Sequence, residues 1–455
     1  MKVFMLGWEF PPYMSGGLGT ACYGLTKGLD QVGVEVSFVL PMSVGQVTGQ
    51  HVSLRTPATL VEKDRLGQRK TTTTTRYGSP SAGKVTEFEH LTMHVLPAIM
   101  QPYATPANFE EVLRKFQQQY QMPGVTPTEV SQVVEEIKAR GGVAGPSGGG
   151  YGGDMLGQVR RYALLAVELA KHEDFDVVHA HDWMTYPAGL AVAAYTGKPL
   201  VIHVHSTEFD RSGEHVWQQV YDIERAGMHG AKRIICVSHW TKNIVVARYN
   251  VDPDKVEVVY NAVELPDGKD AFTPISRDEK IVLFLGRITM QKGPEYFLLA
   301  ARKVIEKFQK VRFIIAGSGE LITKLIEMAA DLGIGRYVTF TGFLRGKDVD
   351  RVFRMADLYV MPSVSEPFGI APLEAMIRNV PVIISKQSGV SEVLTHALKV
   401  DFWDVEEMAN QILAVLRHPP LQRVLRQQGA LELRKLSWRD SADRCREIYE
   451  DVAAR

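Results

Sequence analysis

Two carboxylates separated by seven residues stand in the second half of the chain. Glu366 and Glu374 bracket the run E-P-F-G-I-A-P-L-E. The apolar stretch 357–363 predicts a buried strand, and residues 372–378 predict a helix with Pro372 in its first turn, where the missing N–H costs nothing. Glu366 is therefore expected in a loop between strand and helix, and Glu374 in the first helical turn.

This loop is a natural place for a ligand. In an open parallel sheet, ligands bind at the carboxyl ends of the strands, where the free amides of the next helix face an anion. Glu366 and Glu374 can accept hydrogen bonds from hydroxyl groups, and Gly369 at the same strand end adds weight to a binding site. A nucleotide sugar offers hydroxyls and phosphates together, so the run favours such a ligand. The alternative is a capped helix with acidic residues placed favourably against its dipole.

Two cations follow the first predicted strand of the second half. Arg287 and Lys292 lie in the segment G-R-I-T-M-Q-K-G, residues 286–293, just before Pro294 opens a helix. Cations at a strand end beside a helix N-terminus are suited to a diphosphate. No D-x-D pair stands near a strand end to bring a metal ion, so the cations themselves would stabilise a departing diphosphate. The alternative is a solvated pair of charges.

A glycine loop follows the first predicted strand of the chain. The segment S-G-G-L-G-T, residues 15–20, contains Gly16, Gly17 and Gly19. Without side chains, these residues let the backbone approach a ligand and present amides to phosphate or sugar hydroxyls. The segment matches neither the dinucleotide fingerprint nor the Walker A sequence. A tight turn without a ligand is the alternative.

Histidines gather at two predicted strand ends of the first half. His179 and His181 lie next to Asp182, and His203 and His205 follow on the next strand. Alternation along a strand puts both imidazoles of each pair on one face. Contact with a sugar ranks first among the readings, structural packing second and a zinc site third.

Composition narrows the class of protein. The 455 residues suggest two domains of roughly 200 residues each. Lysine plus arginine equals aspartate plus glutamate, at 52 each, so no overall field recruits nucleic acid or an anionic membrane. The three cysteines are far apart, which argues against a disulfide framework and suits a reducing compartment. Neither a signal peptide nor a membrane span is predicted, so a cytoplasmic location is expected.

Apolar runs alternate with helical patterns along both halves, which predicts an α/β fold with two doubly wound, Rossmann-like domains facing an interdomain cleft. Predicted strands cover 3–7, 35–40, 177–180, 200–205, 233–237 and 256–260 in the first half, and 280–286, 311–317, 338–342, 358–361 and 380–385 in the second.

The domain prediction assigns residues 1–265 to a first domain and residues 275–436 to a second domain. The irregular stretch 261–278 is the expected linker and hinge. Residues 437–455 form a final helix that could pack back on the first domain. Residues 101–153, which end in a glycine-rich run, form an insertion that is either a mobile cover over the cleft or an inert surface loop.

Taken together, these motifs resemble retaining glycosyltransferases of the GT-B fold over nearly the whole chain. The opening G-W-E-F-P-P and the H-D-W element are most similar to the glycogen and starch synthase branch and to related family 4 glycosyltransferases. One departure is Ser15, which stands where bacterial glycogen synthases carry a lysine.

The resemblance implies that residues 1–265 form the acceptor-side domain and residues 275–436 the nucleotide-sugar domain. It also implies a role for each motif. Arg287 and Lys292 would hold the donor diphosphate, which the backbone at Gly16 and Gly17 would line from the other side. Glu374 would bind the ribose. The catalytic pair would be Glu366, which with the amides of Gly369 and Ile370 contacts the transferred sugar and phosphate, and His181, which hydrogen-bonds that sugar. Neither a cofactor nor an essential metal is expected.

The expected function is therefore retaining transfer of a hexose, with glucose from ADP- or UDP-glucose as the leading donor and an α-glucan as the leading acceptor. Another small sugar or glycoconjugate acceptor remains open, as do a nucleotide-sugar epimerase and a regulator that binds nucleotide sugars without turnover. No nucleic-acid partner and no integral membrane segment are expected. The sequence leaves the oligomeric state open.

Overall fold

The computed structural model describes residues 1–11, 16–41, 76–78, 85–87, 89–96, 98, 155–265 and 278–454. The predicted insertion 101–153 therefore lies outside the described residues, as do Ser15 and most of the predicted linker, residues 266–277. Every statement below concerns the described part of the chain.

The first sheet has seven parallel strands in the order β5-β2-β1-β6-β7-β8-β9. They are β1 (Lys2–Leu6), β2 (Glu35–Pro41), β5 (Leu91–Leu96), β6 (Val177–His181), β7 (Leu200–Val204), β8 (Arg233–Cys236) and β9 (Val256–Val258). A separate small hairpin pairs β3 (Arg76–Gly78) with β4 (Val85–Glu87). The strands of the large sheet read as nearly continuous apolar runs because helices cover both faces.

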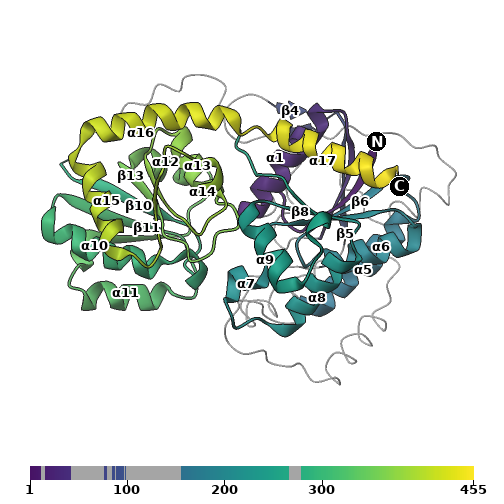
Figure 1. The fold of residues 1–455 in the computed structure, drawn as a ribbon, viewed down its shortest axis with the longest axis horizontal. Helices are drawn as coiled ribbons and strands as arrows, with labels where there is room; N and C mark the ends of the chain where they lie inside the picture. The colour runs from purple at the N-terminus through teal and green to yellow at the C-terminus, as the bar shows by residue number, and fades with distance from the viewer. Residues whose placement is uncertain are drawn as a thin grey trace.

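The helices of the first domain pack on both faces of this sheet (Figure 1). They are α1 (Gly17–Gln31), α5 (Met155–Ala170), α6 (Tyr186–Thr196), α7 (Glu208–Ser212), α8 (Gln218–Gly230) and α9 (His239–Tyr249), with the 3-10 turn η1 (Pro253–Lys255). One core layer joins Phe4 and Val178 to α5, α6, α8 and α9. The opposite layer joins Val3 and Val177 to α1 and to the last helix of the chain.

The second sheet has six parallel strands in the order β12-β11-β10-β13-β14-β15. They are β10 (Lys280–Leu285), β11 (Val311–Ala316), β12 (Val338–Gly342), β13 (Leu358–Met361), β14 (Val382–Ser385) and β15 (Leu398–Val400). The helices and 3-10 turns are η2 (Met290–Lys292), α10 (Pro294–Lys307), α11 (Ile322–Asp331), η3 (Gly335–Tyr337), α12 (Lys347–Met355), α13 (Ile370–Ile377), α14 (Val390–Val393), α15 (Val405–Arg417), α16 (Pro419–Glu432) and η4 (Leu433–Lys435).

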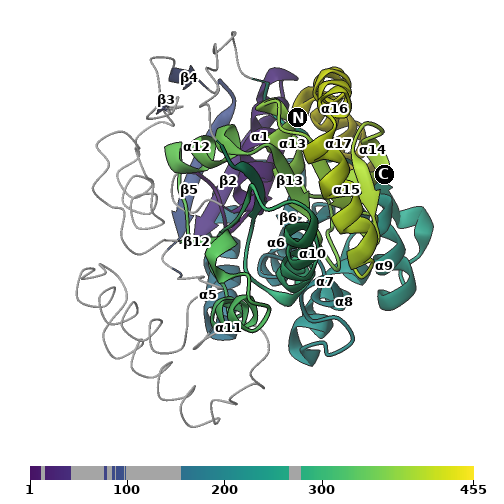
Figure 2. The ribbon, with the colours of Figure 1, turned by 90° about the vertical axis from the view of Figure 1, so that its left-hand side faces the viewer.

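Helices also cover both faces of the second sheet. The core beneath α10, α11 and α15 lies on one face, and the core beneath α12 and α13 lies on the other. Figure 2 shows α11 and α12 toward the β12 edge and α14 to α16 toward the opposite edge. The predicted fold class, two doubly wound parallel domains, is therefore confirmed. None of the helices in the described ranges is long and apolar enough to cross a membrane.

Besides the small hairpin of β3 and β4, two strands of the large sheets escaped the sequence prediction, and both lie at sheet edges. β5 (Leu91–Leu96) pairs only with β2, and β15 (Leu398–Val400) pairs only with β14. The second of these has only three residues. A run so short carries too little periodicity to distinguish a strand from a loop, so its existence depends on the neighbour that pairs with it.

The last helix, α17 (Trp438–Ala453), returns to the first domain and packs against α1 (Figure 1). Ala442, Cys445 and Tyr449 enter the core layer that also holds Val3 and Val177. The core of the first domain therefore includes a helix that follows the second domain in the sequence.

The crossing of α1 and α17 depends on a glycine. A Cβ atom on Gly28 would lie 2.3 Å from the main-chain oxygen of Trp438, and a backbone atom cannot rotate away. The clash in Gly28→Ala should cost about 1–3 kcal/mol, which the ~1 kcal/mol that alanine adds to helix stability offsets in part, so we expect a net loss of up to ~2 kcal/mol in the free energy of unfolding. Urea unfolding measures this loss. Gly335→Ala is the control, because nothing lies within 4 Å of its Cβ position; equal midpoints for the two variants would contradict the expectation.

Candidate active site

Glu366 lies in the loop between β13 and α13, as the sequence predicts, and only 6% of it is exposed. The helix begins earlier than predicted, at Ile370, directly after Gly369, whose φ of 102° is open to glycine at little cost. Glu374 is consequently the fifth residue of α13 and starts its second turn, so the prediction of the first turn was wrong. Pro372 is the third helical residue, where its missing N–H is tolerated.

The Glu366 carboxylate meets one of the predicted cations. The Nζ of Lys292 lies 2.6 Å from Oε2 of Glu366, and the Ser363 hydroxyl donates to the same oxygen at 3.0 Å. The main chain is held as well, because the Gly389 amide donates to the Glu366 carbonyl at 2.9 Å. Two motifs far apart in the sequence thus form one charged centre.

Arg287 follows β10 and is half-buried. Its Nη2 donates to Oε1 of Gln291 at 3.1 Å, and this amide is itself buried. The charge of Arg287 also reaches across to the first domain, where it lowers the pKa of Glu9 against the larger opposing effect of burial. The cation that is predicted to hold a diphosphate therefore lies on the side of its domain that faces the glycine loop.

Glu9 is a site residue that sequence reasoning missed. Its side chain is buried, and Oε2 accepts a hydrogen bond from the Gly19 amide at 2.9 Å. A Cβ on Gly16 would lie 2.7 Å from the same oxygen, so a larger residue there would displace this carboxylate. Burial raises the pKa of Glu9, and the Gly19 amide, Arg287 and the Gly16 amide oppose that rise. The available signals were the position of Glu9 just before the glycine loop and its place in the run G-W-E-F-P-P.

The glycine loop itself opens helix α1. Gly16 is the N-cap residue and Gly17 the first helical residue, and both are exposed. Gly16 has no side chain with which to cap this terminus, and the first turn of α1 contains no acidic residue. The Glu9 carboxylate instead comes from the preceding loop to the amide end of the helix, where negative charge is favourable.

Glu374 stands apart from these charges. Its carboxylate accepts no hydrogen bond from the described residues, and burial raises its pKa while the Arg378 guanidinium opposes the rise. Arg378 donates to the main-chain oxygen of Glu374 at 2.8 Å. The Glu374 carboxylate thus has no hydrogen-bond donor among the described residues, and a ligand hydroxyl could supply one.

The four histidines form a stacked cluster at the ends of β6 and β7. His181 Nδ1 lies 2.9 Å from Nε2 of His205, and His179 Nδ1 lies 2.7 Å from the Tyr449 hydroxyl on α17. Burial lowers the pKa of all four imidazoles, that of His181 to about 3, so the cluster is neutral at pH 7. Within the described part of the chain, the contacts of the His181 ring are with aromatic residues of the first domain, and none joins it to Glu366.

Several buried nitrogens of this cluster have no hydrogen-bond partner among the described residues: Nε2 of His179, Nε2 of His181 and both ring nitrogens of His203. One ligand atom from each of these three residues lies within 4.8 Å of the others, and Cys22, His181 and His205 form a second such group. Neutral imidazole nitrogens are suitable zinc ligands, so the residue types fit the metal reading that the sequence placed third.

Asp182 connects the ends of the two histidine strands. Its Oδ1 accepts hydrogen bonds from the amides of His205 at 2.7 Å and Ser206 at 3.3 Å. Burial raises the pKa of Asp182 to about 7, and Arg211 and the two amides oppose that rise. With a φ of 58°, Asp182 also adopts a backbone conformation that is uncommon outside glycine.

The histidines make stability depend on pH. Burial lowers the pKa of His203 below the ordinary 6.5, so the unfolded chain binds a proton in mild acid that the folded protein excludes. The contribution of His203 to the free energy of unfolding is thus fully present above pH 6.5 and is lost as the pH falls below that value. Between pH 6 and pH 5, we expect the free energy of unfolding of the wild type to fall by about 1.2 kcal/mol more than that of His203→Leu.

Urea unfolding at several pH values measures this difference. The raised pKa of Asp182 changes the free energy of unfolding with pH in the opposite direction. Because Asp182 is present in both proteins, its effect cancels in the comparison. His215→Leu is the control, because the side chain of His215 is exposed and loses little hydration on folding. Parallel pH profiles for wild type and His203→Leu would contradict the expectation.

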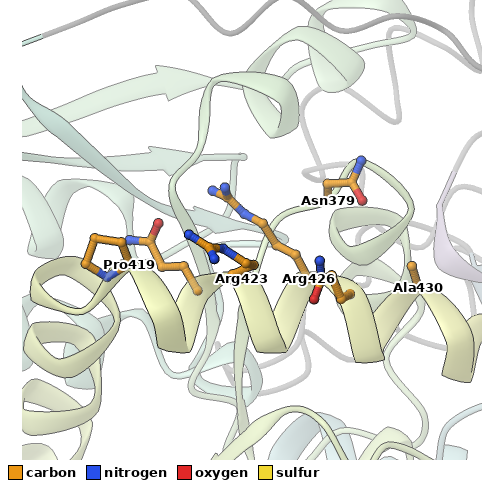
Figure 3. Close-up of a pocket in the computed structure, with 7 residues that line it drawn as sticks. Asn379, Pro419, Arg423, Arg426 and Ala430 are labelled. Atoms are coloured by element: carbon orange, nitrogen blue, oxygen red, sulfur yellow. The ribbon is translucent and has the colours of Figure 1, made fainter.

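A hollow of about 520 Å³ lies elsewhere on the second domain, along α16 (Figure 3). It is lined by Asn379, Pro419, Gln422, Arg423, Arg426, Gln427 and Ala430. Asn379 follows the carboxyl end of α13, whereas Gly369 and Glu366 precede its amino end. The hollow contains none of the predicted site residues.

Three family models together cover most of the chain. Residues 2–103 match the starch synthase catalytic domain, residues 110–266 match glycosyltransferase family 4, and residues 268–431 match the glycosyl transferases group 1. The last of these ranges contains Arg287, Lys292, Glu366 and Glu374, and the first contains the glycine loop.

Individual proteins are similar over comparable lengths. An uncharacterized glycosyltransferase of Methanocaldococcus jannaschii, MJ1607, is 27% identical over 414 residues, which are 87% of this chain and 83% of the relative. The D-inositol 3-phosphate glycosyltransferase of Mycolicibacterium smegmatis is 30% identical and covers 69% of this chain and 76% of its own length. Among solved structures, sucrose-phosphate synthase from Thermosynechococcus elongatus superposes with a TM-score of 0.66 at 17% identity, covering 100% and 99% of the two chains.

Proposed function

Because the chain belongs to the GT-B glycosyltransferases of group 1 and family 4, we propose that it transfers a hexose from a nucleoside diphosphate sugar with retention of anomeric configuration. Glucose from ADP- or UDP-glucose is the leading donor, and an α-glucan is the leading acceptor. The observation that carries the proposal is the contact of Lys292 with Glu366 at 2.6 Å, which places a cation for a phosphate beside a carboxylate for a sugar.

In the proposed complex, the donor diphosphate lies between the two domains. Arg287 and Lys292 hold its oxygens from the second domain together with the amides of Gly369 and Ile370 at the start of α13. The backbone at Gly16 and Gly17 lines it from the first domain, and this loop is open because both glycines are exposed. A helix N-terminus on each side suits the negative charge.

The remaining site residues hold the sugars of the donor. Glu374 accepts hydrogen bonds from the ribose hydroxyls, for which its unoccupied carboxylate is suited. Glu366 and His181 contact the transferred hexose. A His181 pKa near 3 keeps the imidazole neutral, so it would act through a hydrogen bond and not as a cation.

The reaction breaks the bond between the anomeric carbon and the diphosphate oxygen and forms a bond from that carbon to the acceptor oxygen. The acceptor proton passes to an oxygen of the leaving diphosphate. Arg287 and Lys292 stabilise the charge that develops on this group, so the proposal requires no metal ion for the departure. Glu366 stabilises the oxocarbenium-like carbon as positive charge builds there.

A small sugar or glycoconjugate is the second candidate for the acceptor. The relative from Mycolicibacterium smegmatis is named for inositol 3-phosphate, which is a small phosphorylated polyol and not a glucan. The donor side of the site is the same for both candidates, so only the acceptor distinguishes them.

A donor and acceptor screen by mass spectrometry tests the proposal. Purified protein is incubated with ADP-glucose, UDP-glucose and other nucleotide sugars, each with glycogen, maltooligosaccharides, simple sugars and inositol phosphates. A hexose added to one acceptor class, with retained configuration by NMR, supports the proposal. A changed nucleotide sugar with no acceptor product would indicate an epimerase, and tight donor binding without turnover would indicate a regulator.

A further inference from the structure

The loop that carries Glu366 is held by the opposite domain on both sides of that residue. Ser365 and Pro367, the two immediate neighbours of Glu366, each make hydrogen bonds to the first domain. We propose that these contacts, the Glu366 clamp, position the carboxylate for transfer while donor binding does not depend on them. The proposal rests on the proposed function, because it gives Glu366 its role there.

The first arm of the clamp is the hydroxyl of Ser365. It donates to Oδ1 of Asp210 in α7 at 2.5 Å and accepts a hydrogen bond from Nε1 of Trp240 in α9 at 3.3 Å. Asp210 is only 1% exposed and is itself fixed, because its Oδ2 accepts hydrogen bonds from the amide and the hydroxyl of Thr207 at 2.8 Å each. The hydroxyl of Ser365 thus meets a rigid acceptor in the first domain.

The second arm is the main-chain carbonyl of Pro367. It accepts hydrogen bonds from the hydroxyls of Ser238 at 2.5 Å and Thr241 at 3.3 Å, both at the amino end of α9. The approach is so close that a Cβ on Gly389 would lie 2.2 Å from the Pro367 oxygen and 2.5 Å from the Ser238 Cβ. The second arm is thus closely packed against both α9 and Gly389.

A carboxylate from the second domain secures the same helix end. Oε2 of Glu392 accepts a hydrogen bond from the His239 amide at 2.9 Å, and Oε1 accepts one from the Trp240 amide at 2.7 Å. Oε2 also accepts the Tyr260 hydroxyl at 3.0 Å. Free amides at a helix N-terminus attract negative charge, so Glu392 draws α9 toward the loop that carries Glu366.

The contacts from within the second domain do not fix the position of Glu366 relative to the first domain. Lys292 and Ser363 hold the Glu366 carboxylate, and the Gly389 amide holds its carbonyl. All three partners belong to the domain that carries Glu366, so they move with it and cannot set its position relative to the first domain. The hydrogen bonds of Ser365 and Pro367 instead connect the two neighbours of Glu366 directly to the first domain, the side from which an acceptor would come.

Catalysis is sensitive to such positions. A displacement of about 1 Å in a reacting group can reduce the rate about 100-fold, whereas a diphosphate held by charges tolerates it better. Loss of the clamp should therefore lower kcat and leave the affinity for the donor unchanged. The clamp would also couple turnover to the approach of the two domains.

Ser365→Ala tests the clamp, because it removes the hydroxyl that bonds Asp210 and Trp240 and leaves the Glu366 contacts in place. We expect kcat to fall about 10- to 100-fold, while the donor KM changes less than about twofold. Ser365→Thr, which keeps a hydroxyl, should recover part of the loss. Ser391→Ala is the matched control, since that hydroxyl bonds only carbonyls of the second domain, those of Lys386 and Ser388.

Hydrogen exchange gives a readout that does not depend on activity. Amides of residues 363–369 should exchange faster in Ser365→Ala than in wild type or Ser391→Ala. Equal kcat and equal exchange for the two alanine variants would overturn the proposal, as would a parallel loss of donor affinity and kcat. If the wild-type protein transfers no sugar, the proposed function fails, while the exchange measurement still decides whether the clamp orders the loop.

Discussion

Glu366→Gln should lower the rate of sugar transfer by about 100- to 1,000-fold, the range typical for removing a group that stabilises charge in a transition state. Glutamine has almost the same volume but no charge. It cannot balance the positive charge that builds on the anomeric carbon, and it leaves the Nζ of Lys292, now 2.6 Å from the carboxylate, without its counter-charge. The release of nucleoside diphosphate, followed in a coupled assay with the donor from the screen, measures the effect.

The control for this variant is Glu406→Gln. Glu406 also pairs with a lysine, Lys303, but both side chains lie on the surface of the second domain. Such exposed pairs contribute little, so activity and stability should stay near wild type. The thermal midpoint of Glu366→Gln must be measured too, because a buried pair that loses one partner can destabilise the fold. A folded Glu366→Gln protein with full activity would rule out the proposed role.

Arg287→Ala should weaken the binding of a nucleoside diphosphate by about 10- to 100-fold, which corresponds to the ~1.5–3 kcal/mol of a hydrogen bond to a charged group. The Arg287 guanidinium is oriented by Oε1 of Gln291 at 3.1 Å, and a planar guanidinium suits the oxygens of a phosphate. Arg287→Lys should recover only part of the affinity, because a lysine lacks the planar fork that binds two oxygens at once.

Calorimetric titration with UDP and ADP measures this loss without any acceptor. Arg312→Ala is the control, because that guanidinium pairs with Glu279 at a partly exposed site on the same domain. A change in affinity that is equal for Arg287→Ala and Arg312→Ala would show that Arg287 does not hold the diphosphate. The expected result for Arg287→Ala also includes a higher pKa of Glu9, because one of the charges that lowers this pKa is removed.

The local part of the site could be predicted from the sequence. The apolar run before Glu366 and the glycine and proline after it predict a strand, a loop and a helix, and each of these is a pattern of neighbouring residues. The same reasoning placed Arg287 and Lys292 at the end of β10. It misplaced the start of α13, because the helix begins directly after Gly369, which has a positive φ of 102°. The sequence permits a glycine to adopt this conformation but does not require it.

The long-range part could not be predicted. Nothing near Glu9 in the sequence indicates that its carboxylate reaches the Gly19 amide and lies within the field of Arg287 from the other domain. Likewise, nothing in the sequence distinguishes Ser365 from other loop serines. Only the structure shows that its hydroxyl donates a hydrogen bond to Asp210, 155 residues earlier. The partners of Glu9 and Ser365 depend on how the two domains pack against each other. That packing produces no periodic pattern in the sequence.

The sequence by itself determined the two doubly wound domains and the residue types at their strand ends, because alternating apolar runs report burial on a local scale and only the carboxyl edge of a parallel sheet offers its loops to a ligand. Only the tertiary structure decided that Lys292 pairs with Glu366, that Glu9 faces Arg287 and that α17 completes the first domain. Those contacts follow from packing and charge acting across space, which the order of residues does not record.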